Sequence, residues 1–318
     1  MKNLAALTLV LIFAVSSEAQ IKKAYERVKR SVTGSAKLSQ LHYFPSQWEV
    51  DLNLGYRFTS LSLNGKSTGL TVVKADQSIS TAVGELTLGV LDNVYTQLKW
   101  QYLVNFNVDY SQPASLASTK ASGPSDPELA AVVRLVNGES VKLDGKFEFS
   151  ASTGDHQEPD ANNDGDAKSG GNEITVGGRL IALITDSSQL GLTLDYTMSD
   201  VKTSIDQTNG QITESGKTNQ TEIEISTLTE ITSDLFFGLT LNIVNIDGYK
   251  SENLTTLSTS DYGSTSGKSF NIIGKYEFTP DSSVGLQAGY VVDYNTSVGT
   301  VDLSVTGYNL SANYLIRF

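Results

Sequence analysis

The two histidines of the sequence, His42 and His156, are the first candidates for acid–base chemistry. His42 stands in "SQLHYFPSQ", with no neighbouring serine or carboxylate that would complete a catalytic triad. His156 follows Asp155 in "STGDHQEPD", and a carboxylate beside an imidazole can form a general acid–base pair. No further catalytic partner can be located for this pair, so we interpret His156 as a solvated loop histidine. We therefore expect the chain not to be an enzyme.

An acidic loop, "PDANNDGDAKSGGNE", is the second candidate for chemistry because it places oxygen-bearing side chains at alternate positions. Its candidate metal ligands are Asp160, Asn162, Asp164 and Asp166, which match the first half of a calcium-binding loop. The bidentate glutamate that closes such a loop is missing, because the sequence has Gly171 at that position. We expect weak Ca²⁺ binding or a flexible acidic surface loop, and no other cofactor.

Charged side chains recur at every second position of many segments, with apolar side chains between them. In a β-strand this alternation places the charges on one face and the apolar side chains on the other. Around a lumen, such charges either pair with one another or line a hydrated channel. The candidate lumen-lining residues are Glu49, Asp51, Arg57, Lys99, Arg134, Lys142, Lys146, Arg179, Glu222, Glu224, Glu230 and Lys275.

The stretch "VYTQLKWQYLVNFNVDY" (94–110) keeps this alternation far beyond the about five or six residues of an ordinary strand. The pattern recurs in twelve segments between residues 47 and 318. A lipid bilayer explains it, because open sheet edges cannot lie in hydrocarbon and the strands must close into a barrel that is apolar outside. We predict an all-β fold, a transmembrane antiparallel up-and-down β-barrel of about twelve strands.

The connections between the predicted strands alternate between tight turns and longer segments. The longer segments are 64–69, 111–127, 153–172, 200–220, 247–267 and 295–300. This rhythm predicts short periplasmic turns at one rim and long extracellular loops at the other. Aromatic residues spaced to span the apolar band predict girdles at its two edges, in the pairs Trp48 and Phe58, Trp100 and Tyr110, and Tyr308 and Phe318.

The N-terminal region has the pattern of a secretory signal. Residues 1–19 combine a basic start, an apolar run and small residues before the expected cleavage site, so we predict a signal peptide there. Residues 20–46 are basic, and we expect a periplasmic leader or a plug of the lumen, followed by the barrel over 47–318. The sequence has no cysteine, and its net charge of −12 opposes nucleic-acid binding.

The last segment, "YNLSANYLIRF", sets Tyr308, Tyr314, Ile316 and Phe318 on one face. This pattern resembles the C-terminal signature of Gram-negative outer-membrane β-barrel proteins. The resemblance implies that these four residues are an assembly signal, recognised by the barrel assembly machinery. The stretch "SGPSDPELAAVVRL" (122–135) is similar to a strand entry of outer-membrane transporters of the phenol-degradation type, although a glycine is missing and Pro127 interrupts it.

These patterns predict a porin-like channel of the bacterial outer membrane for passive passage of small solutes. Two alternatives remain open. One is a sealed structural or surface-recognition barrel that acts through its extracellular loops. The other is a rim hydrolase using Asp155 and His156, whose layout resembles that of outer-membrane aspartyl proteases. The expected partners are outer-membrane lipid, lipopolysaccharide, the barrel assembly machinery and small solutes.

Overall fold

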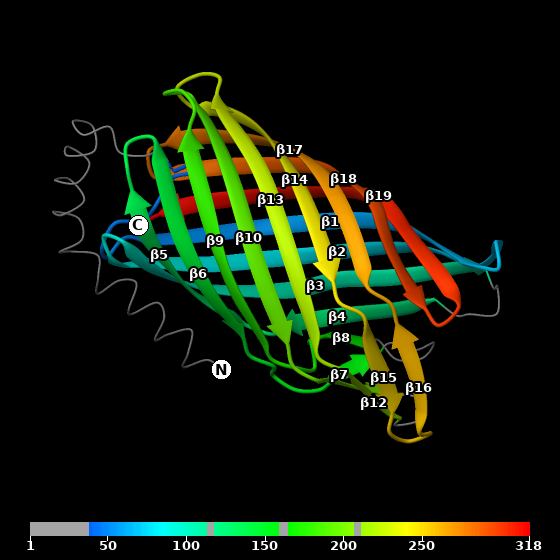
Figure 1. Ribbon diagram of the computed structural model, residues 1–318. Coiled ribbons are helices and arrows are strands. Elements are labelled where there is room, and N and C mark those ends of the chain that lie inside the picture. The colour runs from blue at the N-terminus through cyan, green and yellow to red at the C-terminus, as the bar shows by residue number, and fades with distance from the viewer. Residues whose placement is uncertain (1–37, 113–117, 159–164, 207–210) are drawn as a thin grey trace. The chain divides into compact units, whose positions relative to one another are not determined.

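The computed structural model describes residues 38–112, 118–158, 165–206 and 211–318. Twelve long strands build it, each running antiparallel to its neighbours (Figure 1). Their bounds are β1 Val50–Ser67, β2 Leu70–Leu91, β3 Val94–Gln112, β5 Glu128–Asn137, β6 Val141–Ser150, β9 Glu173–Leu183, β10 Ser188–Ser199, β13 Thr218–Glu230, β14 Leu235–Ile246, β17 Thr265–Thr279, β18 Ser282–Val298 and β19 Val301–Arg317. No helix in these four ranges is long and apolar enough to cross a membrane.

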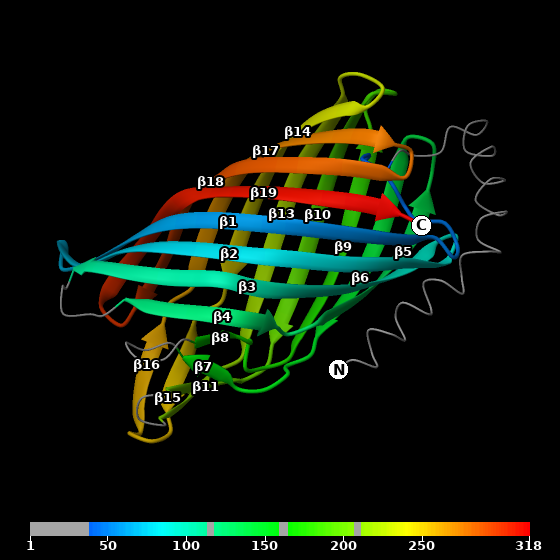
Figure 2. The same cartoon turned by 180° about the vertical axis from the view of Figure 1, so that it is seen from behind.

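The first and last strands close the sheet into a barrel. β1 pairs with β19 in continuous register, from Asp51 opposite Arg317 to Lys66 opposite Asp302. Figure 2 shows β1 lying between β19 and β2 in this closed wall. With no open edge, the strands satisfy one another's backbone groups, which is the condition for a sheet to stand in hydrocarbon. The predicted closed antiparallel barrel of about twelve strands is confirmed.

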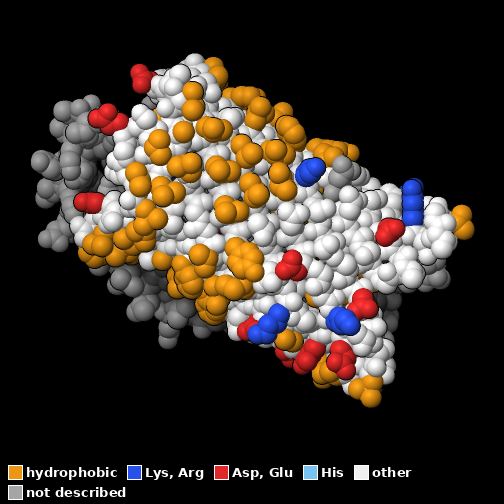
Figure 3. All heavy atoms as spheres, viewed as in Figure 1, with side chains coloured by type: hydrophobic (Ala, Val, Ile, Leu, Met, Phe, Trp, Pro, Cys, Tyr) orange, Lys and Arg blue, Asp and Glu red, His pale blue; other side chains and the backbone are white. Residues whose placement is uncertain are grey.

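The outer face of the barrel is apolar. Side chains such as Tyr56, Leu194 and Phe270 point away from the lumen and are 47%, 53% and 55% exposed. Figure 3 shows hydrophobic side chains gathered over the barrel strands on the visible face, with most of the charged groups toward its ends. Exposed apolar surface on this scale is the signature of a membrane-facing wall rather than of a water-facing one.

The two ends of the barrel differ in their connections. At one end, the short-turn end, the strands are joined by tight turns, such as the one between β2 and β3. The other end, the loop end, carries the long connections, which confirms the predicted asymmetry. Two predicted long connections are wrong, however. β1 joins β2 through Thr68 and Gly69 alone, and β18 joins β19 through Gly299 and Thr300. Thr68 and Gly69 both have positive φ, as a two-residue hairpin turn requires.

Seven short strands extend the wall at the loop end (Figure 1). Their bounds are β4 Thr119–Ser125, β7 His156–Glu158, β8 Gly165–Ala167, β11 Lys202–Asp206, β12 Ile212–Ser215, β15 Tyr249–Asn253 and β16 Ser258–Tyr262. β4 continues the pairing with β3 and lies parallel to β8, while β7 lies parallel to β11. The sheet continues from β12 to β15 and from β15 to β16. Tyr262 of β16 then pairs with Val298 of β18. The long loops are therefore themselves sheet.

A β-bulge in β3 overturns the expectation that residues 94–110 keep one apolar face throughout. Leu103 pairs with Thr81, but the next pair joins Asn105 to Ser80, so Val104 has no partner. One extra residue exchanges the two faces of a strand. Beyond the bulge, Asp109 lies on the outer face and Tyr110 on the inner one. The predicted girdle pair of Trp100 and Tyr110 is therefore wrong.

Candidate functional site in the barrel lumen

The candidate site is the lumen itself, because the predicted charged residues lie on its face. Strand alternation and register place all twelve predicted lumen residues on the inner side of the wall or at its short-turn rim. Their surroundings differ along the barrel axis. Arg57 is exposed, whereas Glu49, Asp51 and Arg134 are buried.

Residues 38–46, which we call the strap, lie inside the barrel at its short-turn end. The Ser39 amide donates to Glu277 Oε1 at 2.7 Å, and Lys275 Nζ donates to the Ser39 carbonyl at 3.1 Å. The Leu41 amide donates to Gln189 Oε1 of β10 at 2.8 Å, and β10 is separated from β17 by β13 and β14. The strap is thus held by strands β17 and β10 through its own backbone. The rest of the predicted leader and the predicted signal peptide lie outside the described residues.

Tyr43 of the strap completes a charged cluster with β1 and β19. Its hydroxyl donates to Asp51 Oδ2 at 2.6 Å, and the Arg317 guanidinium lies over its ring at 4.5 Å. Arg317 Nε also lies 2.8 Å from Glu49 Oε1 and 3.3 Å from Asp51 Oδ1. All three charged side chains are nearly excluded from solvent, so their charges depend on one another for compensation.

Arg134 anchors the middle of the strap. Its Nε and Nη2 donate to the two carboxylate oxygens of Asp144 at 2.7 and 3.2 Å, a bidentate pair. Its Nη1 donates to the His42 carbonyl at 3.1 Å, and its guanidinium lies 4.4 Å from the centre of the Phe44 ring. Asp144, 2% exposed, also accepts from Arg179 Nη2 at 2.9 Å. One buried carboxylate therefore holds two arginines, and one of these holds the strap.

The strap also packs closely against the wall. Phe44 contacts Tyr95 of β3 edge-on, with ring centroids 4.8 Å apart. At Gly89 of β2, a Cβ atom would lie 1.9 Å from the Ser46 carbonyl oxygen, so only glycine lets the strap pass there. Burial, together with the charges of Lys142 and Arg134, holds the pKa of His42 below its ordinary value of 6.5. The short-turn end of the lumen is thus filled.

The loop-end half of the lumen holds a cavity of about 510 Å³. Its charged lining residues are Lys99, Glu128, Lys146, Glu148, Glu173, Asp195, Lys202 and Glu222. Lys99 pairs with Glu128, and Lys202 Nζ lies 2.6 Å from Glu173 Oε1. Hydroxyl groups complete the lining, among them Thr175 and Thr197, whose oxygens are 2.7 Å apart. The cavity is polar, and its ion pairs remain partly accessible to solvent.

A glycine lets the central ion pair of this cavity form across three strands. Lys146 of β6 and Asp195 of β10 are both register partners of Gly177 in β9. Their side chains meet over the glycine, with Lys146 Nζ 2.7 Å from Asp195 Oδ2. A Cβ atom at Gly177 would lie 1.8 Å from Asp195 Oδ1, so a larger residue would displace the carboxylate. Glu222 of β13 lies directly opposite Asp195 on the other side.

Four further predicted lumen residues lie at other places on the inner face of the wall. Lys142 is close to the short-turn rim, where its Nζ donates to the Gly138 carbonyl at 2.7 Å. Glu230 lies at the same end, in register with Phe236. Arg57 lies on the lumen face of β1 between Thr81 and Ser311. Glu224 of β13 lies between Thr193 and Asn242. None of the four borders the cavity.

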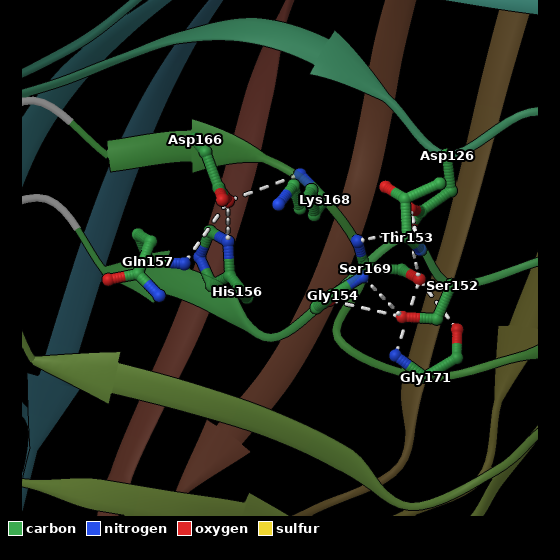
Figure 4. A network of polar contacts seen from close by, with 10 residues as sticks. All are labelled: Asp126, Ser152, Thr153, Gly154, His156, Gln157, Asp166, Lys168, Ser169 and Gly171. Carbon is green, nitrogen blue, oxygen red and sulfur yellow. Dashed lines mark hydrogen bonds and ion pairs between the residues drawn. The ribbon is translucent and has the colours of Figure 1, made fainter.

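Asp126, between β4 and β5, holds two distant parts of a loop together, an arrangement we call the clasp (Asp126, Thr153 and Ser169; Figure 4). Its Oδ1 accepts from the Thr153 amide and hydroxyl at 2.7 and 2.6 Å, and its Oδ2 accepts from the Ser169 amide and hydroxyl at 2.7 Å each. Burial alone would raise the pKa of this carboxyl, but these hydrogen bonds outweigh burial and hold its pKa below the ordinary value of 3.8.

The predicted acid–base pair and the predicted calcium loop meet beside the clasp. His156 Nδ1 lies 2.9 Å from Asp166 Oδ1 (Figure 4). Asp155 is exposed. Asp166 Oδ1 also accepts from the Gln157 and Lys168 amides. The other candidate calcium ligands, Asp160, Asn162 and Asp164, lie outside the described residues. Calcium binding therefore stays a prediction.

Sequence reasoning missed the strap contacts and the clasp. His42, Tyr43 and Phe44 precede the first strand and carry no periodic signal. Asp126 stands in the "SDP" stretch where the alternation stops. The break itself was the available signal, since Pro127 cannot donate to a strand ladder and therefore marks an interruption.

The predicted assembly residues lie on the last strand, facing outward. Tyr308, Tyr314 and Phe318 are 48%, 40% and 45% exposed, and Ile316 shares their face. The Phe318 amide donates to the Val50 carbonyl at 2.8 Å, which ties the end of this strand to the first strand. Recognition of these residues by the assembly machinery stays a prediction.

Comparison with known proteins agrees with this architecture. The sequence matches no protein-family model and no curated protein sequence. An outer membrane channel from Pseudomonas putida F1 superposes with a TM-score of 0.63 at 14% identity, covering 89% of this chain and 100% of the other. The monoaromatic hydrocarbon channel TodX gives 0.44 at 10% identity over 89% and 93%, and the NanC porin gives 0.43 at 12% over 83% and 98%. The chain has the fold of outer-membrane β-barrel channels.

Proposed function

We propose that the protein is an outer-membrane channel for passive passage of small polar solutes. The observation that carries this proposal is a polar cavity of about 510 Å³ inside a closed barrel with an apolar outer wall. Lumens of this kind conduct solutes when hydrated side chains line the path. The short-turn end then faces the periplasm, and the strap is the narrowest part of the path.

Conductance measurements test the proposal directly. The refolded full chain in a planar bilayer is expected to give small, discrete current steps, because the strap fills one end. The double variant Tyr43→Ala/Phe44→Ala removes the two rings that contact Arg317 and Arg134, and is expected to raise the step size severalfold. Refolding of both proteins is checked by heat-modifiable migration in gels. Leak-level current from both folded proteins contradicts a channel and favours the sealed barrel.

A sealed barrel that acts through its loops is the second candidate, and one observation favours it. The strap contacts strands on all sides of the short-turn end, including β17, β10, β5, β3 and β1. Such a filled end conducts nothing if the strap never moves. The unmodified chain separates the two candidates, since a channel gives discrete current steps and a sealed barrel gives leak-level current.

We propose that the protein is not an enzyme. The imidazole of His156 is engaged by Asp166, which is itself held by two backbone amides. Among the described residues, His156 forms no hydrogen bond to a hydroxyl group that could serve as a nucleophile. Any hydrolytic activity of the refolded chain that is lost in His156→Ala contradicts this part of the proposal.

We also propose that the last strand is recognised during assembly and that lipopolysaccharide surrounds the loop-end half of the wall. The outward aromatic face of Tyr308, Tyr314 and Phe318 supports recognition of the strand. The test is assembly in cells of Phe318→Ala, with Phe270→Ala as the control because Phe270 is an outward aromatic residue on another strand. Equal loss of folded protein in the two variants contradicts a special role for the last strand.

A further inference from the structure

The carboxylates of the lumen cavity outnumber its cations. Among the described residues, five carboxylates line it (Glu128, Glu148, Glu173, Asp195 and Glu222) against three ammonium groups (Lys99, Lys146 and Lys202), a formal excess of two negative charges. Each lysine already has a carboxylate partner within ion-pair distance. The negative excess therefore belongs to the cavity itself and is not cancelled by its own walls.

This excess is concentrated at one row of the wall. Asp195 and Glu222 are direct register partners on β10 and β13, and like charges placed opposite one another in a sheet destabilise it. Lys146 lies 2.7 Å from Asp195 and 3.8 Å from Glu148, so a single ammonium group serves two carboxylates. Among the described residues, Glu222 forms no ion pair within 4.0 Å. The row is one cation short.

A cation from solution would balance this row. Its place offers carboxylate oxygens beside hydroxyl oxygens, including those of Thr197 and Ser199, and all of these accept hydrogen bonds. A protonated amine brings several N–H donors and one positive charge, which matches acceptors of both kinds. The volume of about 510 Å³ also accommodates an organic ion together with its bound water.

We infer that the loop-end cavity is a binding site for small organic cations of the protonated-amine class, with Glu222 and Asp195 as its selectivity residues. This inference deepens the proposed channel function and rests on it for the claim that bound cations then cross the membrane. Cations enter because the surplus carboxylates stabilise them. Anions of the same size meet unpaired negative charge and are excluded.

The test pairs a charged probe with a neutral one of the same length. Refolded full chain in detergent at low salt is titrated calorimetrically with 1,4-diaminobutane and with 1,4-butanediol. The diamine is expected to bind and the diol to give no heat. Glu222→Gln is expected to weaken diamine binding about tenfold, because it removes one charge from the site. Lys146→Gln is expected to strengthen binding, since it frees two carboxylates.

The matched control is Glu252→Gln, which removes an exposed carboxylate of β15 that does not line the cavity. Diamine affinity in this variant should equal that of the unmodified chain. Equal binding of diamine and diol, or absence of diamine binding, overturns the inference. So does an equal loss of diamine affinity in Glu222→Gln and Glu252→Gln.

Reversal potentials in a potassium chloride gradient keep this inference separate from the channel proposal. Cation selectivity that falls in Glu222→Gln supports both. If ions flow but the diamine does not bind, the channel proposal stands and the cation-site inference is overturned. If the diamine binds but the current stays at leak level, the cation-site inference stands and the channel proposal is overturned.

Discussion

The two halves of the lumen are lined by the same alternating strands, yet one is filled and the other holds a cavity. At the short-turn end, Arg134 and Asp144 are 6% and 2% exposed, and the strap occupies the remaining space. At the loop end, Lys202 and Glu173 are 35% and 30% exposed and border open volume. Both halves are rich in charge. Exclusion of solvent by the strap, rather than the number of charges, therefore distinguishes a closed polar interior from one that admits solutes.

Removing Arg134 should break the filled half and produce the largest change. Arg134→Ala leaves Asp144 with Arg179 alone and removes the contacts to His42 and Phe44. We expect the free energy of unfolding to fall by about 3–5 kcal/mol, because the buried Asp144 carboxylate loses one of its two cations and the strap loses its contact with β5. Urea unfolding in lipid vesicles, followed by tryptophan fluorescence, measures it.

The loop-end pair provides the comparison for this change. Lys202→Ala also removes one partner of an ion pair, but both partners are about a third exposed. Its cost should stay below about 1 kcal/mol, because water replaces the missing partner. Equal decreases in the free energy of unfolding for Arg134→Ala and Lys202→Ala would contradict the proposed difference between the two halves of the lumen.

A methyl group at Gly177 should have an intermediate effect. In Gly177→Ala the new Cβ would lie 1.8 Å from Asp195 Oδ1 and 2.8 Å from the Leu194 carbonyl oxygen, so carboxylate and strand must shift. We expect a loss of about 1–3 kcal/mol from overpacking and weaker diamine binding. Gly274→Ala is the control, since nothing lies within 4 Å of the corresponding Cβ position. Unchanged diamine binding in Gly177→Ala would show that the Lys146–Asp195 pair takes no part in diamine binding.

The clasp should give a local effect, and one that depends on pH. Because the pKa of Asp126 is lowered in the folded protein, the clasp stabilises the loop above the ordinary carboxyl pKa. That stabilisation is lost as the pH falls through the lowered value. At pH 7, Asp126→Asn should speed hydrogen exchange at the Thr153 and Ser169 amides about tenfold.

Asp109→Asn is the matched control for the clasp. Asp109 is another loop-end carboxylate, whose partners are Asn107 and Ser118. Exchange at Thr153 and Ser169 should not change in this variant. Acid should accelerate exchange in the unmodified chain, after correction for intrinsic rates, and should accelerate it less in Asp126→Asn. An equal acid effect in both proteins argues against the clasp.

The strands were predictable because a bilayer imposes one simple rule on every one of them. Alternation from residue 47 onward identified all twelve strands, and the same rule placed Lys146, Arg179 and Glu222 on one face. The rule operates through local spacing, and local spacing is visible in a sequence. It fails where a single residue changes the register, as at Val104.

The details of the lumen were not predictable for a different reason. Tyr43 meets Asp51 and Arg317 only after the barrel has closed, and no local pattern links these positions. The clasp likewise joins Asp126 to Ser169 across an intervening hairpin. Which charges pair, and which remain free, depends on the stagger of strands around the barrel. Spacing along one strand does not encode that stagger.

The seam between β1 and β19 also has a kinetic consequence. It joins residues as distant along the chain as Asp51 and Arg317, and loop closure over such a separation is slow because entropy is lost before the contacts form. Until β1 and β19 pair, both strands present unpaired edges to which a second incompletely folded chain can add a strand. The yield of intact barrels is therefore a race between intramolecular closure and aggregation, in which dilution favours the first.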